Sequence, residues 1–159
     1  MEIIIKDYTK TDIRSIAEEQ KNFISYHNKF DKDYYSGSKQ QVKEISAYLK
    51  KRTDNSNFRV FVANKNKKII GYVMGWIDKR PPIYKKRRVG YLSNIFVKKN
   101  YRDQGLGKIL YFKMEEWFLN KKVDFIEIKA DCRNLDTVQK FRKYGFKDLS
   151  ITFYKKIKK

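Results

Sequence analysis

Apolar and polar positions alternate in short runs along this chain, and several of these runs have the two-residue period of a β-strand. Residues 58–63 and 69–77 are apolar runs on either side of a polar stretch from Asn64 to Lys68, and this arrangement predicts a β-hairpin. Further segments have the length and apolar content of strands. They are residues 2–7, 91–97, 123–130, 146–149 and 151–155.

Other segments carry apolar residues at helical spacing. The predicted helices cover residues 9–23, 38–52, 108–121 and 136–144, and residues 24–37 between the first two show no clear period. The run from Thr9 to Asp12 is a helix start, Ser38 with Gln41 is a capping-box pattern, and Gly145 follows the last helix as a C-terminal glycine. The third helix is expected to face the core with Leu106, Leu110, Met114, Trp117 and Phe118.

The mixed order of strands and helices indicates an α+β fold. With 159 residues, the chain has the length of one domain and can bury one substantial core. We therefore expect a single domain over residues 1–159.

The charge of the chain is unusual, because 38 Lys and Arg against 18 Asp and Glu give a formal net charge of +20. Such an excess attracts anions over long distances. The cations are densest in residues 79–88 and 155–159, which raises the alternative of an RNA or ribosomal partner. A compositional preference for lysine explains the same excess. We favour it because most aromatic residues fall at core positions and not among the cations.

Other features bear on the cellular location. No stretch approaches the ~18 apolar residues of a membrane span, and the first six residues are too short and acidic for a signal peptide. Cys132 is the only cysteine, so no internal disulfide can form. We expect a cytoplasmic protein that does not bind a membrane or a metal, and that is a monomer or a homodimer.

The most informative segment runs from Arg102 to Gly107, with the sequence Arg-Asp-Gln-Gly-Leu-Gly, between a predicted strand and a predicted helix. A glycine-bearing turn that opens a helix directs unpaired N–H groups and the positive end of the helix dipole at one point, which suits a phosphate. The spacing matches neither the three-glycine dinucleotide fingerprint nor a Walker loop. The sequence therefore predicts a phosphorylated cofactor of another kind.

The same segment, with Tyr101 before it, resembles motif A of the GNAT superfamily of N-acetyltransferases. Residues 134–137 and 141–146 resemble motif B, which has an Asn, a small residue three positions later, and an aromatic-rich helix ending in Gly-Phe. The resemblance implies the GNAT fold, a mixed and mostly antiparallel twisted sheet flanked by helices. It also implies acetyl-CoA as the co-substrate and an amine as the acceptor.

The resemblance places the cofactor residue by residue. Backbone N–H groups from Arg102 to Lys108 would hold the pyrophosphate, and Asn134 would hold the pantetheine arm. The N–H of Ile95 is the candidate oxyanion donor, and Gly105→Val is expected to weaken CoA binding by backbone collision while the fold is kept. The full set of candidate cofactor-binding residues is Ile95, Phe96, Val97, Arg102, Asp103, Gln104, Gly105, Leu106, Gly107, Lys108, Asn134, Phe141 and Lys143.

The acid and the base depart from the pattern of the family. Phe141 stands where many members carry the tyrosine that protonates the leaving thiolate, so Tyr144 is the candidate substitute, with core packing as its alternative role. Tyr91 and Ser93 match the positions of the usual glutamate. They share a face by the two-residue period and could pass a proton through water. His27 and Cys132 are weaker candidates, with surface and packing roles as the alternatives.

Two hypotheses follow. The first is an acetyl-CoA-dependent N-acetyltransferase in which a primary amine of a small molecule or of a protein N-terminus attacks directly in a ternary complex. Residues 91–102 resemble the spermidine/spermine acetyltransferases, but Ser93 and Asn94 replace their acidic pair, and this loss of carboxylates argues against a polycationic acceptor. Residues 79–88 would overhang the cleft. The second is a basic binding module that keeps the fold but has weak or lost catalysis.

Overall fold

The computed structural model describes residues 2–31, 35 and 40–157. By internal contacts the chain divides into a larger unit, residues 1–129, and a smaller unit, residues 130–159. The expectation of a single domain stays a prediction.

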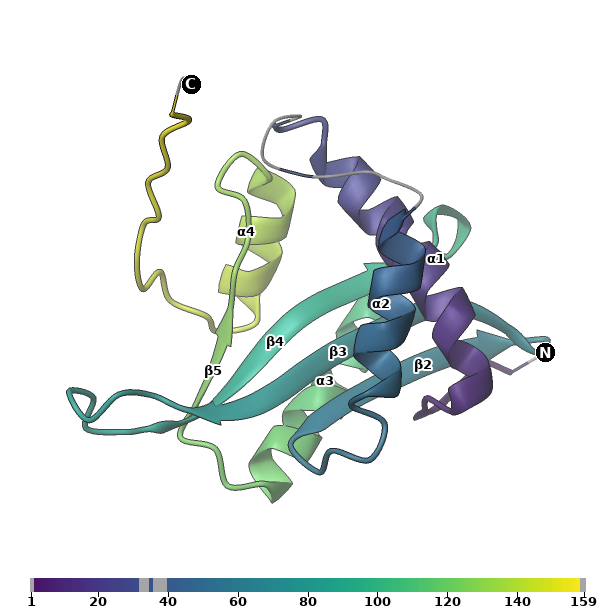
Figure 1. Ribbon diagram of the computed structural model, residues 1–159, viewed down its shortest axis with the longest axis horizontal. Helices are drawn as coiled ribbons and strands as arrows, with labels where there is room; N and C mark the ends of the chain where they lie inside the picture. The colour runs from purple at the N-terminus through teal and green to yellow at the C-terminus, as the bar shows by residue number, and fades with distance from the viewer. Residues whose placement is uncertain (1, 32–34, 36–39, 158–159) are drawn as a thin grey trace. The chain divides into compact units, whose positions relative to one another are not determined.

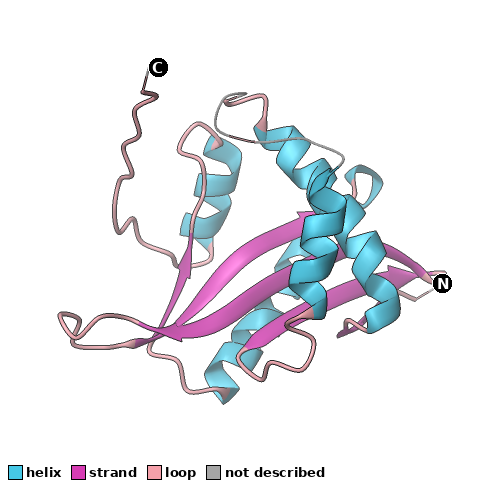
Figure 2. Cartoon of the chain, viewed as in Figure 1, coloured by secondary structure: helices cyan, strands magenta, loops and turns pink. Residues whose placement is uncertain are grey.

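The larger unit is built on a five-stranded sheet (Figure 2). The strands are β1 (Ile4–Asp7), β2 (Phe58–Lys65), β3 (Lys68–Lys79), β4 (Arg88–Val97) and β5 (Phe125–Ile128). Their order in the sheet follows the sequence from β1 to β5. The first four strands are antiparallel, and β5 alone pairs in parallel, with β4. This mixed sheet confirms the predicted α+β class.

The predicted hairpin is confirmed in β2 and β3, with strands that reach further into the polar stretch than expected. Asn66 and Lys67 form the turn, and both have a left-handed backbone, with φ of 53° and 62°. Two consecutive residues with positive φ match the right-handed twist of the flanking strands, so a two-residue turn is enough to join them.

Helices cover both faces of this sheet (Figure 1). The short helix η1 (Lys10–Asp12) leads into α1 (Ile13–His27), which lies with α2 (Gln40–Lys50) on one face, while α3 (Leu106–Asn120) crosses the other. A second short helix, η2 (Lys99–Tyr101), follows β4. The predicted core face of α3 is confirmed, because Leu106, Leu110, Met114, Trp117 and Phe118 are all buried.

The first helix is longer than predicted. It continues past Phe23 to His27, and Asn28 donates its N–H to the carbonyl of Ile24 at 3.2 Å to complete the last turn. The residues after Phe23 contain no proline or glycine to stop a helix, so the loss of apolar period did not mark its end. The predicted cap at Ser38 lies outside the described residues.

Aromatic side chains pack in the core between the sheet and helices α1 and α2. Tyr72 stacks on Phe96, with ring centroids 5.6 Å apart, and joins a cluster with residues of both helices. Burial raises the pKa of the Tyr72 phenol far above its ordinary value, with a smaller contribution from the negative charge of Glu19. Tyr72 therefore stays neutral and acts as a core residue.

The smaller unit contains α4 (Leu135–Lys143), which ends as predicted before Gly145, whose φ is 91°. The two closing strands predicted for residues 146–149 and 151–155 are wrong, because the described part of this unit contains no strand. Backbone groups of this segment turn back on the helix instead. Phe146 donates its N–H to the carbonyl of Phe141 at 3.1 Å, and Arg142 pairs with Asp148.

Candidate active site

The sheet opens between β4 and β5. The two strands pair from Val89 with Phe125 to Leu92 with Ile128, where β5 ends, while β4 continues to Val97. Beyond Leu92, β3 is the only described strand that pairs with β4. The other edge of residues 93–97 therefore presents backbone groups to an open gap.

The direction of the N–H groups along this edge follows from one hydrogen bond. Lys98 donates its N–H to the carbonyl of Ile70 at 2.9 Å, toward β3. Register with β3 is regular from Asn94 to Val97, so N–H groups alternate between the two sides of the strand over this stretch. The N–H groups of Ile95 and Val97 therefore face the gap.

A β-bulge stands where the gap begins. Met74 pairs with Asn94, but the next residue, Gly75, pairs with Leu92, so Ser93 is an extra residue in β4. The shared face of Tyr91 and Ser93 that was inferred from a two-residue period does not follow, because the bulge interrupts that period.

The two side chains have different surroundings. Tyr91 stacks on Trp76, with centroids 5.7 Å apart and 30° between the planes. Ser93 donates its hydroxyl to Oδ1 of Asn94 at 2.7 Å, and Asn94 is buried.

The loop after β4 leads into α3. Arg102 donates Nε to the carbonyl of Val97 at 2.9 Å, which ties the loop to the last residue of the strand. Asp103 and Gly105 have left-handed backbones, with φ of 59° and 80°. These two reversals turn the chain so that α3 begins beside the end of β4, at Leu106.

The first turn of α3 has free donors. Its first helical bond runs from the N–H of Ile109 to the carbonyl of Gly105, at 3.1 Å, so the N–H groups before Ile109 have no acceptor within the helix. Gly105 is the N-cap and has no side chain to accept them, and no acidic residue lies in the first turn. A Cβ at Gly105 would meet no atom within 4 Å, so the space beside it is open. This turn fits an anion.

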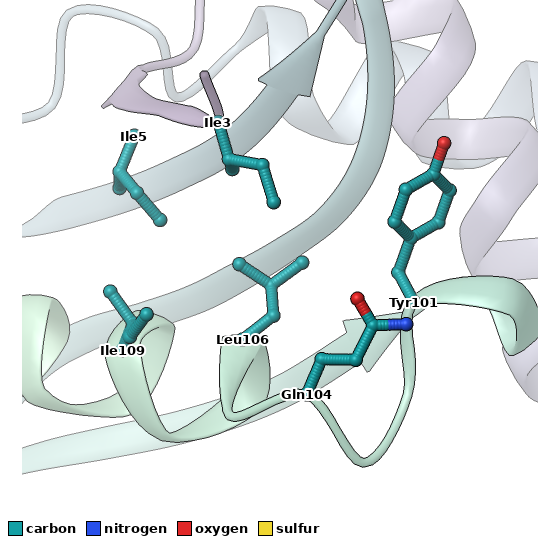
Figure 3. A pocket seen from close by; sticks show the side chains of 6 residues that line it. All are labelled: Ile3, Ile5, Tyr101, Gln104, Leu106 and Ile109. Carbon is teal, nitrogen blue, oxygen red and sulfur yellow. The ribbon is translucent and has the colours of Figure 1, made fainter. Parts of the chain in front are cut away.

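A small apolar cavity of about 130 Å³ lies on the other side of this turn (Figure 3). Ile3 and Ile5 face Leu106 and Ile109 across it, with Tyr101 and Gln104 at one end. Strand order places β1 at the sheet edge opposite β5, so this cavity is separate from the gap.

A family comparison agrees with this geometry. The profile described as "Acetyltransferase (GNAT) family" matches residues 20–146, which include the gap, the loop and α3. This chain belongs to the acetyltransferase (GNAT) family.

Relatives of this GNAT chain support the assignment. An uncharacterized N-acetyltransferase of Methanocaldococcus jannaschii is 27% identical over 150 residues, covering 92% of this chain and 62% of the relative. The chain thus spans less than two thirds of that relative's length.

Solved structures share the fold. A variant of a Bacillus halodurans protein has a TM-score of 0.82 and 19% identity, covering 97% of this chain and 99% of that chain. The aminoglycoside N-acetyltransferase AAC(6')-Iy, solved in complex with CoA, has a TM-score of 0.79 and 18% identity, covering 98% of this chain and 95% of that chain.

The remaining motif residues of this GNAT chain lie in the smaller unit. Asn134 is the N-cap of α4 and accepts the N–H of Val138 at 3.0 Å through its carbonyl. At the other end of α4, the ring of Phe141 contacts those of Tyr144 and Phe146, and Lys143 is exposed. Their roles toward the cofactor and the thiolate stay predictions.

Sequence analysis missed one carboxylate of this GNAT domain. Glu127 of β5 lies opposite Tyr91 of β4, one residue before the end of the β4–β5 pairing. It forms an ion pair with Arg80, which follows β3. In the sequence, this residue was indicated only by its being a single acid within the apolar strand sequence Phe-Ile-Glu-Ile.

Among the residues that the structure describes, no cluster of three or more His, Cys, Asp or Glu side chains is arranged to hold a metal ion. Within the same residues, none of the helices combines the length and the apolar character needed to cross a bilayer.

Proposed function

We propose that this chain is an N-acetyltransferase that uses acetyl-CoA to acetylate a primary amine. The observation that carries the proposal is the continuity of two features in the larger unit. The open edge of β4 ends at Val97, and the loop with the free N–H groups of α3 follows within ten residues. A ligand with an amide-containing arm and a diphosphate requires these two features side by side.

The residues present fit acetyl-CoA. The free N–H groups from Leu106 to Lys108 and the exposed Arg102 and Lys108 would hold the diphosphate, and the space beside Gly105 admits it. The outward N–H group of Val97 would pair with an amide of the pantetheine arm, in the manner of an added strand, which leaves that of Ile95 for the thioester.

Acetyl-CoA, when bound, supplies a thioester carbonyl that an amine can attack. Ile95 would donate its N–H to the oxygen that gains negative charge, and a backbone donor fixed by the β3–β4 pairing needs no reorganisation for this role. An amine held in the same complex would attack the carbonyl carbon directly and displace the CoA thiolate, without a covalent enzyme intermediate.

Two side chains of β4 beside the gap are the candidates for taking the proton of the amine. Tyr91 and Ser93 would relay the proton of the amine through water, since neither is a strong base at neutral pH. Phe141 cannot donate a proton to the leaving thiolate. Tyr144 is the candidate donor, although a thiol with a pKa near 8.5 also leaves without one.

The test is release of CoA from acetyl-CoA with a panel of amines. The panel holds amino acids, peptides with a free N-terminus, aminoglycosides and spermidine, and titration calorimetry measures CoA binding in parallel. The proposal requires binding of CoA and time-dependent thiol release that depends on both protein and amine. Absence of CoA binding would refute it. CoA binding without release for any amine would favour a binding module.

A further inference from the structure

A row of side chains crosses three strands next to the gap. The register pairs Trp76 with Tyr91 and Tyr91 with Glu127, and cross-strand partners share a face of the sheet. Trp76 packs against the core cluster under α1 and α2, so this face is opposite α3. The row ends at Glu127, whose side chain is 25% exposed.

Arg80 completes this row from the β3–β4 connection, which projects beyond the sheet in Figure 1. Its guanidinium forms an ion pair with Glu127 and lies 4.7 Å from the ring centroid of Tyr84 and 5.9 Å from that of Phe125. The Arg80 side chain is only 12% exposed. The two rings and the carboxylate of Glu127 therefore hold the guanidinium of Arg80 in a fixed position beside Glu127.

The charge around this pair is strongly positive. Residues 79–88 contain six cations and no acid. The carboxylate of Asp124, near the start of β5, is paired with Lys86 at 3.4 Å. A polycationic acceptor would meet this field unfavourably, whereas an anionic group near Arg80 would be attracted.

We infer that Glu127 and Arg80 form the acceptor-recognition pair, and that the acceptor is a small amine with an anionic group on a neighbouring carbon. This inference rests on the proposed function. Glu127 accepts a hydrogen bond from the amine, while the fork of Arg80 binds the carboxylate or phosphate of the same molecule. An ion pair offers one acceptor and one donor side by side, which is the complement of a zwitterion. The rings of Tyr91 and Trp76 continue the same face of the sheet across β4 and β3.

The test compares amines that differ by one charge. α-Amino acids are paired with their amides, and 2-aminoethyl phosphate separates a phosphate from a carboxylate as the anionic group. Spermidine represents polycations. Each is measured in two ways, by the KM for CoA release and by the shift in melting temperature of the protein without cofactor. The second readout does not depend on catalysis, so the inference can fail or hold separately from the proposed function.

The variants are Glu127→Gln and Arg80→Met, with Lys85→Met as the control that removes a cation from the same connection. We expect acids to have at least tenfold lower KM than amides. Arg80→Met should bring that ratio near one, and Glu127→Gln should raise KM for both members of a pair at least tenfold. Lys85→Met should keep the ratio, and CoA affinity should stay unchanged in all three variants.

Several results would overturn the inference. Equal or better use of amides or spermidine by the unmodified protein is one, and the absence of both turnover and thermal shift across the panel is another. A third is loss of melting temperature in Arg80→Met and Glu127→Gln with the acceptor ratio retained, which would make the ion pair structural only. Arg80→Lys, which keeps the charge, checks that a change in ratio does not come from misfolding.

Discussion

Gly105 combines a left-handed backbone with open space beside it for a ligand. Its φ is 80°, and a Cβ there would meet no atom within 4 Å. The collision with backbone expected from the sequence therefore does not occur within the chain. A side chain at this position would instead carry the strain of a left-handed backbone and fill the space proposed for the diphosphate.

We predict that Gly105→Val weakens CoA binding at least tenfold in titration calorimetry. The control is Asn66→Val, which puts the same β-branched residue at a φ of 53° in the β2–β3 turn, away from the loop. Both variants carry comparable backbone strain, so both should lose similar stability. Equal CoA affinity in the two variants would contradict the placement of the diphosphate.

The candidate site was predictable to different degrees at the residue scale. The loop from Arg102 to Gly107 could be predicted because glycine positions and a helix start are local features of the sequence. The position of Glu127 beside Tyr91 could not, since it depends on the register between two strands more than thirty residues apart. The bulge at Ser93 was missed because an extra residue leaves no mark in an otherwise apolar run.

At the scale of elements, helix α3 approaches the sheet through glycines. A Cβ on Gly90 would lie 2.6 Å from Cδ1 of Phe118, a fully buried ring. We predict that Gly90→Ala lowers the free energy of unfolding by about 1–3 kcal/mol, measured by urea denaturation, because the ring has no room to shift.

Two further variants check the cause of this loss. Gly107→Ala is the control, since its Cβ would be 3.8 Å from Cγ2 of Val97, an ordinary contact, and alanine favours the helix. Adding Phe118→Leu to Gly90→Ala should recover part of the stability. A Gly90→Ala protein as stable as the unmodified one would show that the helix can move away.

The contacts of Asp12 at the start of α1 predict how the stability of the protein depends on pH. Asp12 accepts the N–H of Thr9 at 2.9 Å and pairs with Lys6 at 3.3 Å. Burial alone would raise the pKa of this carboxyl, but the hydrogen bonds from Thr9 and the charge of Lys6 bring it below its ordinary 3.8. The stabilisation is therefore present above the unfolded pKa and is lost as pH falls through the folded one.

Asp12→Asn is expected to lower the free energy of unfolding by about 0.5 kcal/mol at pH 7. Urea midpoints at pH 7 and pH 2.5 measure the effect. The difference from the unmodified protein should shrink at the lower pH, because the Asp12 carboxylate becomes protonated as the pH falls through its lowered pKa. A difference independent of pH would mean that packing and not charge is responsible.

The elements themselves were largely predictable, since the hairpin and the core face of α3 follow from apolar spacing. The exceptions share a cause, which is dependence on distant partners. Residues 146–149 and 151–155 have strand-like composition, yet a strand also needs a neighbour for its backbone groups, and sequence pattern does not provide one.

At the scale of the whole molecule, the high positive charge is partly used within the chain. Among residues 79–88, Arg80 pairs with Glu127, Lys86 pairs with Asp124, and Arg88 donates to the carbonyl of Lys121 at 3.0 Å. Arg87 also donates Nε to the carbonyl of Arg80 at 3.1 Å, so four of the six cations in that cluster make contacts within the chain. The alternative of an RNA partner stays a prediction.

The two compact units are predicted to unfold as one domain. The smaller unit has thirty residues, and helix α4, the one helix among its described residues, contains no buried residue, so it cannot supply a core of its own. Trp76 and Trp117 report on the larger unit, and a dye on the exposed Cys132 reports on the smaller one. Their urea transitions should coincide, and an earlier dye transition would indicate two domains.

The extra residue in β4 also determines where the pairing between β4 and β5 ends. Pairing between β4 and β5 stops at Leu92, directly before Ser93. Removing the codon for Ser93 would restore continuous alternation along β4, and β5 could then be extended beside it as an ordinary parallel ladder. The opening between the two strands would then close, although no other residue of the chain had been changed.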